Sequence, residues 1–585
     1  MAAVGSSVLA ESAAADTAVR PRLRLGLFVD GPEQPRWLVE TFARLARLDF
    51  IDLVVIASDD STAASLPWMW RAYSWLDRLV FRPRTGDAER RSIAEEIPHR
   101  RFMSVRQCDV SWVGEMAAMK LDVAFAFGRF DDYALKDIAR YGSWRFFFGD
   151  ERQTLDHWAG FQEAAQGAPV VSSGVTVRFG PRSSERLAYQ SWSRTYPLSM
   201  ARNRENLLRK TAEFAGRTLR ELHSGGAAWL ESRPLASRQA IAPAAPRPVE
   251  MALYLSRLGG RLAQRAAQKL TQIEQWCLGY RFDAGERWQG ELSRFTRLLP
   301  PTDRFWADPF AYRRDGRHFI FLEELPFARG KAHISVMEVD RDGRHSKPRC
   351  VLKRDYHLSY PFLIEDKGEL YMVPETGENR TVEIYRCVEF PWQWQLEKVL
   401  LRDAWCVDAT FHRHEGKWWM FVNIGVEGAE NYDELHLYHA DELLGEWTPH
   451  IANPIKSDVR GARPAGRLYR QGGALYRLAQ ICAPLYGSGI VVHKVLELNT
   501  ERYREEEVER VLPGKSSGLL GMHTYNRDGE LSVMDGFLRR PRLHGRAVDV
   551  MRSVMRDMAR PVRSRLTGQG RATVAGAGNA VREVQ

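Results

Sequence analysis

The strongest constraint on the fold is a repeat that fills the second half of the chain. Five segments each contain a strand-like run, a tight turn with glycine and a second strand-like run, and their anchor positions are 52, 48, 55 and 60 residues apart. Two strands joined by a tight turn, repeated about every fifty residues, are typical of propeller blades. The pattern predicts a five-bladed β-propeller over 281–537. The anchors are Pro309, Pro361, Ala409, Pro464 and Thr524, and the turn glycines are Gly316, Gly368, Gly416, Gly472 and Gly529.

The first half of the chain has the pattern of an α/β domain, which we expect over 22–225. An apolar strand at 22–30, an amphipathic helix at 36–48 and a second apolar strand at 51–58 open it. This βαβ order predicts a parallel, doubly wound sheet of the Rossmann-like kind. Further strands are predicted at 121–129 and 144–148, an antiparallel pair at 174–180 and 187–193, and a long helix at 199–223.

Three other segments complete the predicted organisation. Residues 1–21 are expected to be disordered, and 226–280 to hold an Ala- and Pro-rich linker followed by an amphipathic helix at 250–275. Residues 538–585 form a basic tail. The formal net charge is +10, and ten arginines and two aspartates between Arg539 and Arg571 contribute +8 of it. The rest of the chain carries only +2, so a nucleic-acid-binding surface spread over the folded domains is not expected.

Several classes of protein are excluded by pattern. The sequence has no run of about 18 uninterrupted apolar residues, so no membrane-spanning helix is expected. The first twenty residues lack the basic start of a secretory signal, and the six cysteines have no CxxC spacing. We therefore expect a cytoplasmic protein. The sequence also lacks HExxH, GxGxxG and Walker motifs, so neither a metal nor a cofactor is predicted.

The blade register gathers a set of candidate site residues. The first strand of each blade lines the channel of a propeller, so the residues just before the anchors should meet at its mouth. Carboxylates there can accept sugar hydroxyls or catalyse acid–base chemistry, and arginine can hold a carboxylate or phosphate. Alternatively, an aspartate that opens a blade can serve only to bind a neighbouring blade's backbone. The pre-anchor residues are Asp308, Tyr360, Asp408, Arg463 and His523; Glu323, Glu375 and Gln480 close second strands, and His357 precedes the second unit.

The same motifs carry a resemblance to a known family. WADPF (306–310), HLSYPF (357–362), VDATF (407–411) and ARPAG (462–466) resemble the N-terminal propeller domain of plant glucosamine inositolphosphorylceramide transferases, a domain also found in bacterial envelope-associated proteins.

WADPF and VDATF are also similar, more distantly, to motifs of five-bladed furanosidases. That likeness implies Asp308 as nucleophile or base, Asp408 as transition-state stabiliser, and Glu375 or Glu323 as acid. Neither glutamate stands in the hydrolases' own third motif.

The first half resembles the formyltransferase fold through RYGSWRFFFGDE (140–151) and GVTV (174–177). Formyltransferases need an Asn-x-His pair, and the corresponding positions here are Arg145 and Phe147. An aromatic ring cannot replace imidazole as a proton carrier, so formyl transfer is not expected. The resemblance instead implies a domain kept for nucleotide or glycan binding, or for docking.

Together these patterns favour a carbohydrate-active, glycosyl-transferring enzyme that builds a cell-envelope glycan or glycolipid. A furanosidase-type hydrolase and a non-catalytic scaffold for glycans or lipid headgroups stay open. The expected partners are a sugar or glycolipid substrate and a nucleotide-sugar donor. In the tail, 546–560 places apolar residues on one helical face and arginines on the other, which suits the inner face of an anionic membrane or packing against the propeller.

Overall fold

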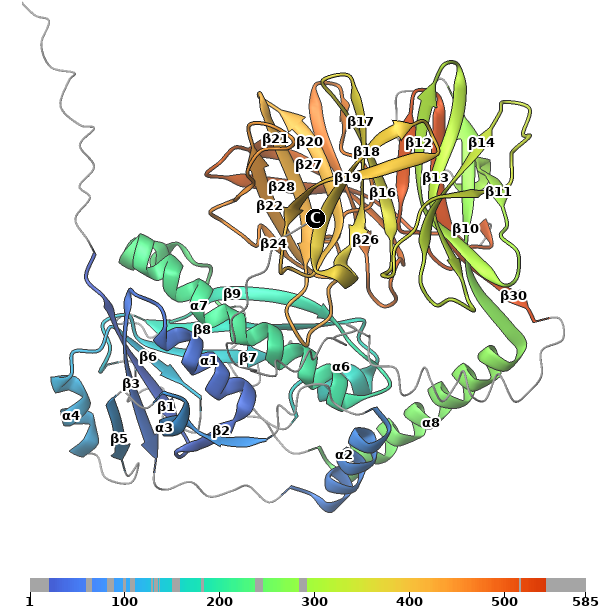
Figure 1. Cartoon of the computed structure of the whole chain (residues 1–585). Helices are drawn as coiled ribbons and strands as arrows, with labels where there is room; N and C mark the ends of the chain where they lie inside the picture. The colour runs from blue at the N-terminus through green and yellow to red at the C-terminus, as the bar shows by residue number, and fades with distance from the viewer. Residues whose placement is uncertain are drawn as a thin grey trace, which may run out of the picture.

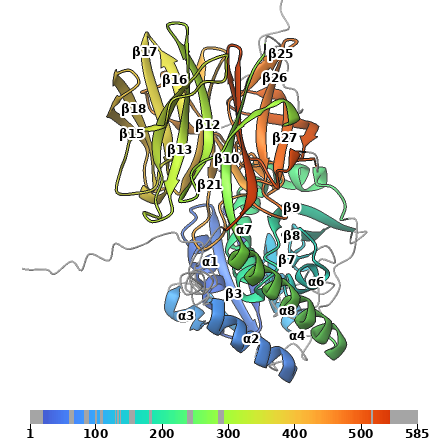
Figure 2. The ribbon, with the colours of Figure 1, turned by 90° about the vertical axis from the view of Figure 1, so that its right-hand side faces the viewer.

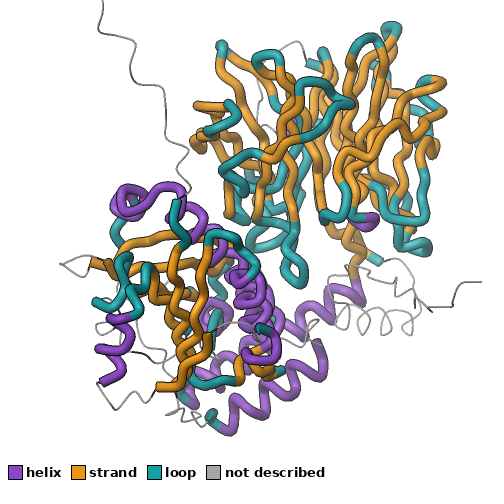
Figure 3. The backbone as a smooth tube through the Cα atoms, turned by 60° about the vertical axis from the view of Figure 1, so that its left-hand side comes forward, coloured by secondary structure: helices purple, strands orange, loops and turns teal. Residues whose placement is uncertain are grey.

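The structure, a computed structural model, contains an α/β domain and a β-propeller that lie one above the other (Figure 1). In the described part of the chain, the α-helices belong to the α/β domain or to α8, the helix that leads to the propeller (Figure 3), and the propeller contains single 3-10 turns at Leu292–Arg294 and Gly377–Asn379. No helix of the described part of the chain is long and apolar enough to cross a membrane. The predicted disordered segment, up to residue 19, and the predicted tail helix at 546–560 lie outside the described residues. The structure describes residues 20–58, 66–81, 89–97, 101–105, 111–127, 130, 135, 137–149, 158–179, 184–236, 246–283, 292–514 and 517–542.

The α/β domain is built on a seven-stranded sheet in the order β5-β3-β1-β6-β7-β8-β9. The first five strands of that order are parallel and the last two are antiparallel, which confirms the predicted fold class. The sheet strands are β1 (Leu23–Val29), β3 (Ile51–Ser58), β5 (Arg101–Val105), β6 (Val123–Ala126), β7 (Ser143–Phe148), β8 (Val170–Phe179) and β9 (Ser184–Arg194). The short strands β2 (Glu33–Pro35) and β4 (Arg90–Ser92) pair separately, and the helices are α1 (Arg36–Ala46), α2 (Trp68–Phe81), α3 (Ile93–Glu96), α4 (Ser111–Ala118), α6 (Phe161–Gln166), α7 (Met200–Ser232) and α8 (Pro248–Thr271).

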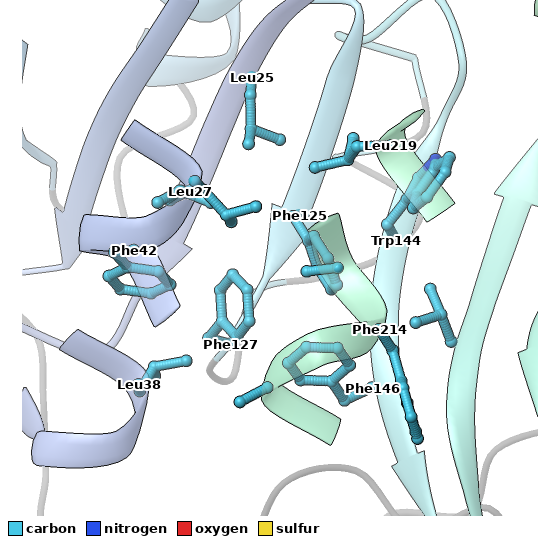
Figure 4. Close-up of a cluster of buried hydrophobic side chains, with 14 of the residues drawn as sticks. Leu25, Leu27, Leu38, Phe42, Phe125, Phe127, Trp144, Phe146, Phe214 and Leu219 are labelled. Carbon is cyan, nitrogen blue, oxygen red and sulfur yellow. The ribbon is translucent and has the colours of Figure 1, made fainter. Parts of the chain in front are cut away.

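Alternation along the central strand fixes which helices cover each face of the sheet. Leu25 and Leu27 of β1 point into a core shared with α1 and α7, where Phe42 and Phe214 pack (Figure 4). Phe28, the next residue along β1, belongs to the opposite core with α4. Because neighbouring strand residues face opposite sides, an apolar run such as β1 is buried on both faces.

The second half of the chain forms five blades, four with four strands and the third with a fifth strand added, so the predicted five-bladed propeller is confirmed. The first strands of neighbouring blades contact one another, β12 with both β16 and β29, and therefore surround the channel. The first two blades contain β12 (Arg304–Arg314), β13 (Arg317–Pro326), β14 (His333–Val339) and β15 (Arg349–Leu352), then β16 (Ser359–Asp366), β17 (Glu369–Thr376), β18 (Thr381–Glu389) and β19 (Gln393–Leu401). The next two contain β20 (Cys406–His414), β21 (Lys417–Ile424), β22 (Glu434–Ala440), β23 (Thr448–Pro449) and the added β24 (Lys456–Ser457), then β25 (Tyr469–Gln471), β26 (Ala474–Ile481), β27 (Gly489–Leu498) and β28 (Tyr503–Val511).

The fifth blade is assembled from both ends of the propeller segment. It consists of β29 (Tyr525–Asp528), β30 (Leu531–Pro541), β10 (Gln272–Phe282) and β11 (Thr296–Leu298). Strand β10 pairs with β30 in unbroken antiparallel register. The propeller therefore begins at Gln272, before the expected 281, and α8 ends at Thr271 rather than at 275. The sequence repeat covers only the inner two strands of each blade. Strand β10 is an outer strand that precedes the first repeat, so the repeat could not predict it.

The long helix predicted at 199–223 extends further than expected. Ser224-Gly225-Gly226 suggested a stop after 223, but α7 runs to Ser232 with a kink at Gly226, whose backbone has φ 59°. The chain then stays on the α/β domain, because the Ala236 amide donates to the Glu185 carbonyl. The predicted linker thus begins later than 226. Helix α8 follows it and packs along α2 (Figure 2).

Closure of the ring predicts where the propeller is most sensitive to mutation. Leu278 of β10 is fully buried between the fifth and first blades, among residues such as Trp306 and Val533. We expect Leu278→Ala to lower the free energy of unfolding by about 2–5 kcal/mol, because it leaves a cavity at the seam. Denaturant unfolding would measure this, with the exposed Leu496→Ala as control. Equal small losses in both variants would contradict a seam that stabilises the ring.

Candidate functional site

Three of the five pre-anchor residues have a backbone conformation that is rare for residues other than glycine. The φ angles of Asp308, Tyr360 and Asp408 are 48°, 47° and 54°. Each residue sits where the pairing of the first two strands of its blade shifts register. Left-handed backbone at a bulge is costly and is concentrated at functional sites. The first three blades thus use the same irregularity at the same end of the channel.

Asp308 and His523 meet at the seam between the first and fifth blades. The Asp308 Oδ1 atom lies 3.1 Å from His523 Nε2 and accepts a 2.6 Å hydrogen bond from the Thr524 hydroxyl. His523 Nδ1 lies 2.9 Å from Asp535 Oδ2. One imidazole therefore stands between two carboxylates, and all three residues are buried.

This arrangement fixes the charges of the group. Burial lowers the pKa of His523, but the charges of Asp535 and Asp308 outweigh it and raise the pKa to about 10. Burial raises the pKa of Asp308, yet the neighbouring His523 charge and its hydrogen bonds bring it below the ordinary value. At neutral pH we therefore expect an imidazolium beside an ionised Asp308.

The same group is the one place in the described part of the chain where three metal-ligand side chains gather. One ligand atom each from Asp308, His523 and Asp535 lies within 4.8 Å of the others. A histidine that is protonated on both nitrogens has no lone pair for a metal, so a cation could bind here only by displacing a proton from His523.

A second cluster surrounds Asp408. Arg463 donates to both carboxylate oxygens of Asp408, with Nε–Oδ2 at 2.6 Å and Nη2–Oδ1 at 3.2 Å. The Gln480 amide donates a further 2.6 Å bond to Oδ2, and Arg463 Nη2 lies 3.4 Å from Glu375 Oε2. The bidentate contact fixes the orientation of Arg463.

The pKa of Glu375 shifts in the opposite direction from that of Asp308. Burial, followed by repulsion from Asp408, raises the pKa of Glu375 well above the ordinary value. Asp308 also repels it, so the two carboxyl groups interact across the site. Glu375 therefore holds its proton more tightly than an exposed glutamate does.

Glu323 pairs with His357 on the side of the first two blades. His357 Nε2 lies 3.1 Å from Glu323 Oε1, and the His357 side chain keeps 31% exposure while Glu323 is buried. Burial raises the pKa of Glu323. Burial lowers the pKa of His357, but its hydrogen bond to Glu323 reverses the direction and raises it. This pair is the more solvent-accessible part of the predicted set.

Tyr360 occupies the same register position but is used differently. Its ring is fully buried against Phe310, at a centroid distance of 4.9 Å, and its hydroxyl hydrogen-bonds Thr410 Oγ1 at 2.7 Å. Its side chain therefore packs between the first and third blades. The charges of Asp408 and Asp308 are close enough to add to burial in raising the pKa of Tyr360.

The polar residues that close the second strands form another ring beside the first. Binding the backbone of a neighbouring blade was the structural role considered for an aspartate that opens a blade, and in the structure Asp535 has this role. Its Oδ1 accepts hydrogen bonds from the amides of His523 and Thr524, and its Oδ2 accepts one from the amide of Asp308. The members are Glu323, Glu375, Asn423, Gln480 and Asp535, all paired through their backbones with the pre-anchor segments of their own blades.

Aromatic residues that the repeat could not reveal border both ionic clusters. The ring of Trp276, from β10, lies 4.2 Å from that of His523. The Tyr486 ring lies 5.1 Å from His523 and 5.0 Å from the Arg463 guanidinium, so it spans the two clusters. Trp276 comes from the outer strand missed by the repeat, and Tyr486 from a loop that varies between blades.

The α/β domain docks at this end of the propeller. Lys210 of α7, fully buried, lies 2.6 Å from Asp433, and Arg217 makes two hydrogen bonds to Glu434. The Arg194 guanidinium lies 5.0 Å from the ring of Tyr432, whose ring is also 5.8 Å from the Arg463 guanidinium. The loop before β22 therefore connects the α/β domain to the candidate site.

Sequence comparison locates the propeller among known proteins. Residues 299–530 match the family model described as glucosamine inositolphosphorylceramide transferase 1, N-terminal. The protein of that name from Arabidopsis thaliana is 36% identical over 231 residues, 38% of this chain and 30% of the relative. Its counterpart from Oryza sativa subsp. japonica is 34% identical over 247 residues, 40% and 33% of the two chains. The chain thus spans about a third of the length of these curated relatives, and the predicted resemblance of the propeller is confirmed.

Solved structures with a similar fold are more distant. A family 117 glycoside hydrolase from Zobellia galactanivorans is 12% identical, with 46% of this chain and 91% of that chain covered and a TM-score of 0.30. The catalytic domain of the Coprinopsis cinerea GH62 alpha-L-arabinofuranosidase is also 12% identical, with 40% and 90% covered and a TM-score of 0.31. Neither bears on the activity of this chain. The formyltransferase resemblance of the first half stays a prediction.

The charge state of His523 predicts a pH dependence of stability. Its pKa is about 10 in the folded chain and about 6.5 when unfolded, so the folded state holds the proton more tightly. Its contribution is complete below the unfolded pKa and is lost as the pH rises toward 10. Between pH 6.5 and 8.5 we expect the free energy of unfolding to fall by roughly 2 kcal/mol from this residue. Denaturant unfolding of His523→Gln should lack that fall.

The exposed His345→Gln is the control for this experiment, because it changes a histidine on the same propeller outside the cluster. It should keep the wild-type slope. If His523→Gln and the wild type lose stability in parallel over this pH range, His523 is not held as an imidazolium.

Proposed function

We propose that this chain is a carbohydrate-active transferase that moves a sugar onto an inositol-phosphate-containing or related glycolipid of the cell envelope. The mouth of the propeller channel is its sugar site. The match of 299–530 to a domain of glucosamine inositolphosphorylceramide transferases supports the class of substrate. A nucleotide sugar is the donor, and the acceptor is met at the cytoplasmic face of the membrane.

The observation that carries the proposal is the opposite shift of two carboxyl pKa values in the channel mouth. Burial and repulsion from Asp408 raise the pKa of Glu375 well above its ordinary value, while the His523 charge and its hydrogen bonds lower the pKa of Asp308. Two carboxyl groups held in opposite states are what acid–base chemistry at neutral pH requires. A ring built only for packing has no need of this difference.

The roles follow from these charges. The Asp308 carboxylate takes the proton of the acceptor hydroxyl as its oxygen bonds to the anomeric carbon. The Glu375 acid donates its proton toward the oxygen that leaves the sugar. The acceptor loses one proton and the leaving group gains one. Arg463 and the His523 imidazolium add two cations that favour a phosphate-bearing headgroup.

A second candidate is a non-catalytic scaffold that binds glycolipid headgroups. One observation favours it: Asp308, Asp408 and Arg463 are buried and already bonded to protein partners. In this alternative the exposed edge at His357 would contact the ligand, and the inner charges would hold the blades together.

Mutation of the two carboxyl groups separates these candidates. We expect Asp308→Asn and Glu375→Gln each to lower kcat at least a hundredfold, because a general acid or base contributes about that much or more. Transfer would be measured from labelled UDP-glucosamine and UDP-N-acetylglucosamine to inositolphosphoryl ceramide in detergent. Calorimetry with the same lipid should give a Kd within about threefold of the wild type.

Glu365→Gln is the matched control, since Glu365 lies on β16, next to the β17 strand of Glu375, but accepts a hydrogen bond from Tyr312 instead of contacting the site residues. It should keep full activity. Unchanged transfer in both site variants would refute the catalytic proposal. If neither the wild type nor any variant transfers the sugar, while all of them bind the lipid with the same affinity, the result would favour the scaffold.

A further inference from the structure

The outward face of α2 is apolar. Trp68, Trp75, Leu76 and Leu79 are 77%, 65%, 52% and 55% exposed. With Ala72 they occupy positions i, i+4, i+7, i+8 and i+11, which share one face of a helix. This face contains no charged residue.

The opposite face of the same helix is buried and mostly aromatic, with Asp77 as its charged residue. Trp70, Tyr73 and Phe81 are buried, and the Trp70 ring lies 4.6 Å from that of Trp158. The Tyr73 hydroxyl hydrogen-bonds that of Tyr254 on α8 at 2.7 Å. The buried face thus anchors α2 to the α/β domain and leaves the apolar stripe outward. The outward face of α2 is therefore a surface that another apolar medium should cover.

The charges around this face are basic. Arg71 and Arg78 are exposed on one flank of the apolar stripe. Helix α8 runs alongside α2 (Figures 1 and 2) and is mainly basic, with Glu250 its one acidic residue. Its cations are Arg257, Arg261, Arg265 and Lys269.

A cleft of about 830 Å³ opens beside the apolar stripe, between α2 and α7. Trp70 and Trp75 line it, together with four arginines and three acidic residues, which are Arg71, Arg78, Arg90, Arg204, Asp77, Glu89 and Glu205. Tryptophan and arginine together suit a phosphate-bearing lipid headgroup above its acyl chains.

We propose that α2, flanked by α8, lies in the interface of an anionic lipid bilayer. Trp68, Trp75 and Leu79 enter the boundary between headgroups and acyl chains, and the arginines contact lipid phosphates. Tryptophan and leucine on one face with cations beside them are typical of helices that lie in a membrane interface. A second copy of the chain is a poorer occupant, because it would bring Arg71 and Arg78 close to their like-charged counterparts.

This contact is separate from the one predicted for the tail at 546–560, and it does not depend on the sugar chemistry. It is continuous with the candidate site, because α8 ends at Thr271 and β10, which carries Trp276, begins at the next residue. A helix of 24 residues is roughly 36 Å long. One rigid element thus connects the proposed lipid-facing surface to the fifth blade.

Co-sedimentation of the full chain with vesicles tests the inference. We expect binding to phosphatidylcholine vesicles that contain phosphatidylglycerol, and at least tenfold weaker partitioning to phosphatidylcholine alone. W68S/W75S/L79S should lower partitioning to the anionic vesicles at least tenfold, because three apolar anchors are lost. R71Q/R78Q should lower it about tenfold and reduce its dependence on salt.

V388S/L396S is the matched control, since it removes two exposed apolar side chains from the propeller. It should bind as the wild type does, and all variants should keep the wild-type Tm. Wild-type partitioning by W68S/W75S/L79S would overturn the proposal and assign binding to another segment. Equal binding of the wild type to neutral and anionic vesicles would also overturn it. A third contradicting result would be no vesicle binding at all, together with a concentration-dependent dimer of the wild type that W68S/W75S/L79S abolishes. Sedimentation does not use sugar transfer, so failure of the proposed enzyme activity would leave this result unaffected.

Discussion

The carboxylate of Asp535 is the interaction on which the channel mouth depends. It accepts two backbone hydrogen bonds within the fifth blade and a third from Asp308 across the seam of the propeller, and it contacts the His523 imidazole. The left-handed backbone of Asp308 takes its amide out of the strand ladder, and Asp535 supplies the acceptor that this buried amide needs. The same side chain therefore supports the first blade, the fifth blade and the charge of the imidazole.

The architecture was largely predictable because the inner hairpins repeat. The five anchors located the blades, and the positions just before them located Asp308, Asp408, Arg463 and His523. What the sequence lacked was the partner of each residue. Arg463 holds Asp408 because their blades are neighbours around the channel, although 55 residues separate them. Spacing along the chain contains no information about such lateral contacts.

Elements outside the repeat were harder to predict. The sequence of β10 was assigned partly to a helix and partly to a linker, so Trp276 was missed. The glycines at the end of the predicted long helix were interpreted as a stop, but only Gly226 departs from helical geometry and α7 resumes beyond it. Packing against the α/β domain outweighs the local preference of glycine for a turn.

The docking of the two domains is specified by buried charge. Burial raises the pKa of Asp433 to about 6, even though the nearby Lys210 lowers it. A buried lysine that lost its carboxylate would be costly, so the pair disfavours separation of the domains. Through Tyr432 and Arg194, the α/β domain then has a fixed relation to Arg463. The first half of the chain is thus part of the surroundings of the site.

The shared fifth blade also affects how the protein is made. Strand β10 leaves the ribosome early, but its partner β30 ends at Pro541, near the far end of the described chain. At translation rates of 5–20 residues per second, β10 waits roughly 15–50 s for that partner. During this time the edges of an unfinished ring are open to other strands. The nascent chain is then most exposed to aggregation, and chaperone binding would be most useful before the last strand emerges.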